Sequence, residues 1–141
     1  MGSMRGVWRM AWLAVALTAA GCSEELGPER IPTASASGVV TMSGQPLSPG
    51  WIEFQPYDGA LGDPASTRIN PDGSFRFERA PLGKVVVRLY GVPLEAKAAI
   101  WLLRTTSPIR RVTQSPEGPP MQIDVVEELY RHQAKQAEAG R

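Results

Sequence analysis

The chain has 141 residues, 43% of them hydrophobic, with 15 basic and 14 acidic side chains and a formal net charge of +1. This near-neutral balance, without a cluster of lysines and arginines, excludes the electrostatic footprint of a nucleic-acid-binding protein. A single cysteine and a single histidine exclude a metal site built from several such ligands, so we expect no metal and no cofactor.

The first segment has the layout of an export signal. Arg5 and Arg9 precede an uncharged run of apolar and small side chains, residues 10–21. This run is too short to cross a hydrocarbon layer, which requires about 20 residues of helix. We therefore expect a cleaved signal rather than a spanning anchor. The alternatives are an ordinary cleavage site beside an incidental cysteine, or a disordered N-terminal tail.

The end of this run, Ala19-Ala20-Gly21-Cys22, resembles the lipobox of bacterial lipoproteins, with alanine at position 19 where that family prefers leucine. The resemblance implies cleavage between Gly21 and Cys22, loss of the signal peptide 1–21, and lipidation of Cys22 with acyl chains such as palmitate. Loss of Arg5 and Arg9 lowers the 15 basic groups to 13 against 14 acidic groups, a net charge of −1. We therefore expect the membrane contact to come from lipid.

Residues 22–36 are polar, contain Pro28 and Pro32, and show no hydrophobic period, which is typical of a flexible tether. Ser23, rather than aspartate, follows the lipid site. By resemblance to the sorting rules of bacteria with two membranes, this favours the outer membrane over the inner membrane. We expect an exported, lipid-anchored protein of the cell envelope.

Residues 37–126 alternate short apolar segments with Gly, Pro and Asp turns, which predicts one all-β sandwich of about seven strands. Residues 39–42 and a segment around Ile52 and Phe54 are expected to form a strand pair joined by a loop. Residues 70–74 contain Pro-Asp-Gly, a strong hairpin signal.

Period-two alternation assigns the faces of the next strands. Phe75 and Phe77 are expected to point inward and Arg76 outward. In the following strand the inward set is Val85, Val87 and Leu89, and the outward set is Val86, Arg88 and Tyr90.

The last third of the chain is less regular. Residues 93–103 favour a short helix or an irregular crossover, with a buried strand as the alternative. Residues 107–113 predict an edge strand, because Pro108 cannot donate to a ladder inside a sheet. Residues 121–125 predict the last strand, and residues 127–141 form a charged tail, either a frayed helix or disordered.

Several motifs in this order resemble the carboxypeptidase regulatory-like domain: Gly44-Gln45-Pro46-Leu47, Gly50-Trp51-Ile52-Glu53-Phe54, Asn70-Pro71-Asp72-Gly73 and Gly83-Lys84-Val85. The resemblance implies a transthyretin-like (prealbumin-like) β-sandwich, and small lipoproteins of this shape are abundant in planctomycete-type bacteria. Members of the family are usually accessory or adhesive domains, and a fold alone does not determine function.

No catalytic set can be assembled from the sequence, so we expect a protein that is not an enzyme. The one histidine, His132, lies in the charged tail, away from any nucleophile and orienting group. Transthyretin-shaped hydroxyisourate hydrolases end in Tyr-Arg-Gly-Ser. Here Tyr130-Arg131-His132 departs from that ending.

Two candidate binding sites remain. Aromatic side chains could form a platform for sugar or peptide, with packing at the rim of the core as the alternative: Trp51, Tyr57, Tyr90 and Trp101. Three loop aspartates could converge on Ca²⁺, although their spacing matches no calcium loop and favours turn formation: Asp58, Asp63 and Asp72.

Together these features predict a non-catalytic cell-envelope lipoprotein whose tethered β-sandwich serves binding or envelope organisation. An exposed strand edge is one route to a partner, which would be an envelope protein or a glycan and not a nucleic acid. The alternatives are a carbohydrate-binding module that presents aromatic rings and a transthyretin-like hydrolase.

Overall fold

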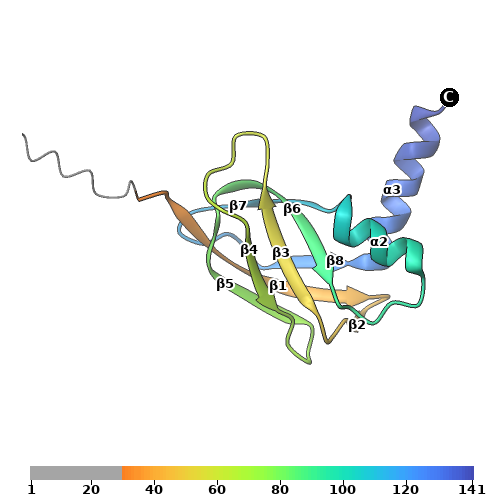
Figure 1. Cartoon of the computed structure of the whole chain (residues 1–141), viewed down its shortest axis with the longest axis horizontal. Helices are drawn as coiled ribbons and strands as arrows, with labels where there is room; N and C mark the ends of the chain where they lie inside the picture. Colours follow the sequence, from red (N-terminus) through yellow and green to blue (C-terminus); the bar gives the residue numbers. More distant parts are fainter. Residues whose placement is uncertain (1–29) are drawn as a thin grey trace, which may run out of the picture. The chain divides into compact units, whose positions relative to one another are not determined.

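The computed structural model describes residues 30–141, so the expected signal segment lies outside the described residues. Two four-stranded sheets form the domain, and two helices follow the sixth and the last strand (Figure 1). The elements are β1 (Thr33–Met42), β2 (Gln45–Pro46), β3 (Trp51–Pro56), β4 (Ala65–Arg68), β5 (Ser74–Pro81), β6 (Gly83–Tyr90), α2 (Lys97–Thr105), β7 (Arg110–Thr113), β8 (Met121–Asp124) and α3 (Val125–Ala139).

The two sheets differ in their pairing. In the first, β1 pairs antiparallel with β2 and β5 and parallel with β8. The second is antiparallel throughout, in the order β4-β3-β6-β7. This architecture agrees with the expected all-β sandwich. The strand β7 lies at a sheet edge, as expected from the proline that precedes it.

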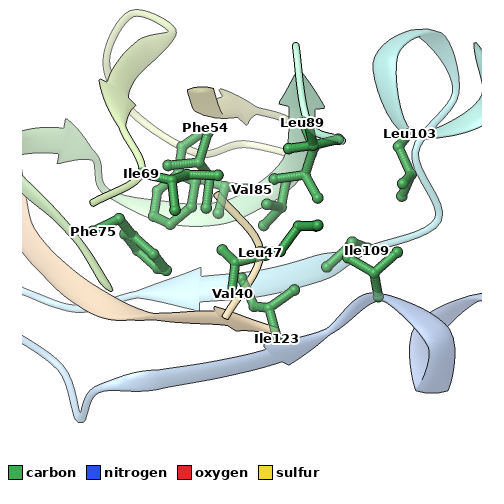
Figure 2. Close-up of a cluster of buried hydrophobic side chains, with 14 of the residues drawn as sticks. Val40, Leu47, Phe54, Ile69, Phe75, Val85, Leu89, Leu103, Ile109 and Ile123 are labelled. Atoms are coloured by element: carbon green, nitrogen blue, oxygen red, sulfur yellow. The ribbon is translucent and has the colours of Figure 1, made fainter. Parts of the chain in front are cut away.

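Alternating apolar side chains from both sheets fill one core (Figure 2). The ring of Phe54 on β3 stacks on Phe77 of β5 with centroids 4.3 Å apart, and Phe75 meets Phe54 edge-on at 5.9 Å. Leu103 of α2 is completely buried, so this helix closes the core beside β6. The side chains predicted to point inward are buried: Phe75, Phe77, Val85, Val87 and Leu89. Ile52 and Phe54 of β3 are buried as well.

The predicted turn at residues 70–74 forms, but the predicted hairpin around it is wrong. The amide of Gly73 donates to the carbonyl of Asn70 at 2.8 Å, and Gly73 has a φ of +81°. However, β4 before the turn and β5 after it belong to different sheets. The turn is therefore a corner between layers, because local turn chemistry does not specify the partner of each strand. The expected pairing of residues 39–42 with the segment around Ile52 is wrong for the same reason.

Two boundaries also differ from expectation. The strand β1 begins at Thr33, so residues 33–36, expected to belong to the tether, are part of the sheet. Ala34 and Ala36 are buried, and such small side chains give a weak hydrophobic period. The last helix, α3, begins at Val125, although residue 125 was expected to end the last strand and the charged tail to begin at residue 127. Residues 93–103 contain the start of α2, as favoured.

One carboxylate joins the end of the sheet to the last helix. Asp124 caps α3 by accepting from the amides of Val126 at 3.1 Å and Glu127 at 3.2 Å. Its other oxygen accepts from the Thr41 hydroxyl at 2.9 Å and the Gly44 amide at 2.8 Å. Burial raises the pKa of Asp124, but these hydrogen bonds outweigh it and the pKa is lowered from its ordinary value.

We expect Asp124→Asn to destabilise the domain by about 1–3 kcal/mol at pH 7, because the amide oxygen can still cap α3 but the NH₂ group then faces the Gly44 amide, which loses its acceptor. Since the native pKa is depressed, the carboxylate's contribution is present above its unfolded pKa and is lost as the pH falls below about 4. Urea unfolding at pH 7 and pH 3 measures the difference between variant and wild type, which should shrink at pH 3.

The control is Asp63→Asn, which replaces the carboxylate of an exposed loop residue. It should leave the free energy of unfolding unchanged at both pH values. An Asp124→Asn penalty that stays constant between pH 3 and pH 7 would contradict the role assigned to the carboxylate.

Candidate functional site

The outer face of the β4-β3-β6-β7 sheet carries a row of aromatic and cationic side chains. Trp51 on β3 lies opposite Arg68 on β4 and opposite Tyr90 on β6. Their chain neighbours on these strands point into the core, so alternation directs all three side chains outward. Arg104 of α2 lies over the ring of Tyr90 and extends the row. We call Arg68, Trp51, Tyr90 and Arg104 the cation–aromatic row.

Each cation of the row lies over one ring. The guanidinium carbon of Arg68 is 5.2 Å from the centroid of Trp51, and that of Arg104 is 5.9 Å from the centroid of Tyr90. Trp51 is 44% exposed, and Tyr90 is half-buried. Contacts of this kind contribute about 0.5–1 kcal/mol at exposed sites, which is enough to restrict the orientation of the two arginines.

A second, polar row lies next to it along the strands. The Tyr90 hydroxyl donates to Oε1 of Glu53 at 3.3 Å, and Nη1 of Arg88 lies 3.7 Å from the same oxygen. Within residues 30–141 the buried Nε of Arg88 and Oε1 of Gln55 form no hydrogen bond. Next to the rings along β3 and β6, the outer face of this sheet therefore carries polar and charged side chains. It does not pack as a second apolar core.

A cleft of about 470 Å³ opens at the same end of the sheet. Trp51 and Arg68 form part of its wall, together with three connecting segments. These are residues 48–50 before β3, residues 69–71 after β4, and Gly91 after β6. The wall therefore includes Ser48, whose hydroxyl donates to the Ile69 carbonyl at 3.4 Å, and Asn70, whose amide donates to the Ser74 hydroxyl oxygen at 3.0 Å.

Trp101 lies on α2, three residues before Arg104 and thus on a neighbouring part of the helix surface. It is 61% exposed, while Leu103 anchors the opposite side of the helix in the core. Trp51 and Trp101, two of the four predicted platform residues, are therefore exposed, as a platform requires.

Tyr57 does not join the other aromatic candidates. It follows β3 at Pro56, whereas Trp51 begins that strand, so their backbones lie about 20 Å apart. Tyr57 is half-buried and supports a different arginine, Arg110, whose guanidinium carbon lies 5.4 Å from its ring centroid. Of the four predicted platform residues, the structure thus brings Trp51 and Tyr90 together as neighbours and places Trp101 on the adjoining helix.

The three loop aspartates do not converge. Asp58 pairs with Lys84, and this hydrogen bond lowers the pKa of the Asp58 carboxyl. Asp72 accepts from the hydroxyl and the amide of Ser74, which lower its pKa in the same direction. Between residues 30 and 141, no group of three His, Cys, Asp or Glu side chains lies close enough together to hold a metal ion.

The remaining predicted positions are His132, Gly21 and Cys22. His132 lies on α3 and its ring contacts the Gln136 amide at 3.0 Å. Gly21 and Cys22 lie outside the described residues, as does the signal segment. No helix within residues 30–141 is long and apolar enough to span a membrane.

No protein-family model, curated protein or solved structure matches this chain.

The two arginines and Asn70 were missed by sequence reasoning. Arg68 ends a short polar strand and Arg104 ends an uncertain helical segment, so neither stands out in a chain with many arginines. Alternation placed Tyr90 on the outer face, but nothing in the sequence shows that β3 has β4 on one side and β6 on the other. That pairing creates the row.

We expect iodide to quench the fluorescence of Trp51 more strongly than caesium does, because Arg68 attracts anions to the ring. The measurement requires a variant in which Trp8, Trp12 and Trp101 are replaced by Phe. Adding Arg68→Gln should lower the iodide quenching constant about twofold, the effect of one partly screened charge near 5 Å.

Two controls separate charge from exposure. The neutral quencher acrylamide should report the same accessibility with and without Arg68→Gln. Arg79→Gln, which removes an exposed arginine of β5 on the other sheet, should change neither ion's quenching constant. Equal quenching by iodide and caesium before the Arg68 substitution would exclude a cation at this ring.

Proposed function

We propose that this protein is a non-catalytic, lipid-anchored protein of the cell envelope whose β-sandwich is a binding module. The support for export and anchoring is the order of a short basic segment, an uncharged apolar run, a lipobox-like Ala-Ala-Gly-Cys22 and a polar stretch before β1. Ser23 supports the outer membrane. In this proposal Cys22 holds the protein at the membrane and the sandwich meets the partner.

The sandwich in this proposal is a transthyretin-like domain of the carboxypeptidase regulatory-like type. Its support is the pair of four-stranded sheets joined by connections that repeatedly change layer. One of the eight strands, β2, has only two residues, so seven longer strands carry the two sheets. The motifs that suggested this family lie at layer-crossing turns and at the starts of strands.

The ligand we propose is a glycan, bound at the cation–aromatic row and its cleft. The observation that carries this proposal is Trp51, which is nearly half exposed on the wall of a cleft that also presents polar side chains. Aromatic rings offer an apolar face to the C–H face of a sugar, and nearby amides and hydroxyls fix its orientation. Ser48 and Asn70 line the cleft, and each keeps hydrogen-bonding capacity for that second role: the Ser48 oxygen can still accept, and the Asn70 side chain still has a free oxygen and a second N–H.

This face is better suited to binding than the edge of the first sheet at β5. The edge strand β5 carries Arg76, which pairs with Glu78 at 2.8 Å and with Glu117 at 3.1 Å. Charged side chains along an edge discourage the addition of another strand. A partner protein added to β5 would have to displace both ion pairs.

Mass spectrometry of the mature N-terminus tests the anchor. We expect the protein purified from a bacterial host to begin at Cys22 and to carry acyl chains, since several chains bind a bilayer far more firmly than one. Cys22→Ser should abolish the acyl mass. An unmodified N-terminus at another residue would overturn the proposed localisation.

A glycan array tests the binding surface. For the purified chain carrying Cys22→Ser, we expect Trp51→Ala to weaken binding of any captured polysaccharide by about tenfold or more, roughly 1.4 kcal/mol, because the stacking face is lost. Tyr130→Ala, which removes a 69% exposed ring on α3, is the matched control and should bind like the parent. Equal loss in both variants would argue against a site at Trp51.

A further inference from the structure

The cation–aromatic row ends in two arginines that have no anionic partner among residues 30–141. Four arginines of the domain are ion-paired, among them Arg76 with Glu78 and Arg111 with Glu128, whereas Arg79 and Arg110 form no ion pair within residues 30–141 and lie away from this row. Arg68 and Arg104 are exposed and lie over the rings of Trp51 and Tyr90, and their side chains form no hydrogen bond or ion pair within residues 30–141. Their charges therefore remain uncompensated on this face.

Contact with a ring prepares a guanidinium for binding an anion. The ring occupies a face of the planar group, while the N–H donors project from its edge. Each arginine is thus held in place by an interaction that uses none of its hydrogen-bonding capacity. A carboxylate can accept two parallel hydrogen bonds from such an edge.

The one carboxylate on this part of the sheet does not neutralise the row. Glu53 already faces Arg88 at 3.7 Å and accepts from the Tyr90 hydroxyl at 3.3 Å. The negative charge of Glu53 is therefore balanced by Arg88, in the polar row next to the rings. Arg68 and Arg104 give this face a local excess of positive charge in a chain that is close to neutral as a whole.

We propose that the row binds an acidic glycan, a polysaccharide chain whose sugar residues carry carboxylates. Arg68 and Arg104 each pair with a carboxylate of a different sugar residue, and the rings of Trp51 and Tyr90 contact the sugars between them. This inference rests on the proposed function, glycan binding at the same face, and adds the chemical class of the ligand.

The spacing of the row supports a chain rather than a single sugar. The backbones of β4 and β6 are two strand spacings apart, about 10 Å, and Arg104 lies beyond β6. The two cations are therefore separated by two aromatic rings. A polymer with a charge on each of several sugars matches this separation, whereas one monosaccharide contacts only one end of the row.

The cleft favours a glycan over a membrane surface. Anionic bilayers attract clusters of about four to eight lysines and arginines on an exposed segment. Here the row has only two guanidiniums, and one of them, Arg68, lines a hollow together with Trp51, Ser48 and Asn70. A hollow with hydroxyl and amide groups suits a ligand that enters it, and a flat bilayer does not.

Polygalacturonate and its fully methyl-esterified form test the inference, because they share a backbone and differ in charge. For the full-length chain carrying Cys22→Ser, calorimetry should give a Kd for the acid form about tenfold lower than for the ester in about 0.05 M salt. The advantage should disappear in about 1 M salt, where charges are screened within roughly 3 Å.

The decisive variant combines Arg68→Gln with Arg104→Gln. Its Kd for polygalacturonate should rise to that for the ester, while its Kd for the ester stays unchanged. Arg79→Gln is the matched control and should bind both polymers like the parent. An unchanged unfolding transition shows that each variant remains folded, and Arg68→Lys with Arg104→Lys should retain part of the preference because the charge is kept.

The outcomes separate the two proposals. If the ester binds as tightly as the acid, the acidic class is wrong and glycan binding stands. If neither polymer binds, and neither does any polysaccharide of the array, the proposed glycan-binding function itself fails. If the double variant loses binding only to vesicles containing anionic phospholipid, the row is a membrane-docking surface and the inference is overturned.

Discussion

The stacked rings of Phe54 and Phe77, 4.3 Å apart, join the two sheets at the centre of the core. Because Phe54 points inward, the residue at an odd offset along the same strand, Trp51, points outward. A register slip of one residue would bury Trp51 and expose Phe54, so the packing of the core also determines the composition of the outer face. The cation–aromatic row is thus a consequence of interior packing and of strand order together.

The sequence predicted the faces of the strands much better than their partners. Along β5 and β6, apolar and polar residues alternate because only the face that meets the core must be apolar. The residues predicted to point inward on these strands are buried. The partner of a strand depends on contacts between distant segments. For that reason the turn at residues 70–74 was predicted correctly while the hairpin was not, and residues 33–36 were separated from β1 because alanine and serine alternate too weakly.

The same distinction governs the candidate site. Trp51 and Tyr90 were found from residue type and alternation, which are local properties. Their register as neighbours, and the approach of Arg68 and Arg104 to their rings, arise from the order of β4, β3 and β6 and from the position of α2. Tyr57 has the same residue type as Tyr90 but follows the opposite end of β3. Residue type alone could not exclude it.

The chain enters the sandwich at the end opposite the row. Thr33 pairs with Pro81, near the start of β6, whereas the row lies where β6 ends at Tyr90 (Figure 1). Tension between an attachment before Thr33 and a ligand at the row would run along the strands. The ladders that hold β1 to β5 and β8 lie across that direction, so their hydrogen bonds share the load instead of opening one after another. A load applied in this way would therefore shear the pairing of β1 with β8 along its length rather than peel it open from one end.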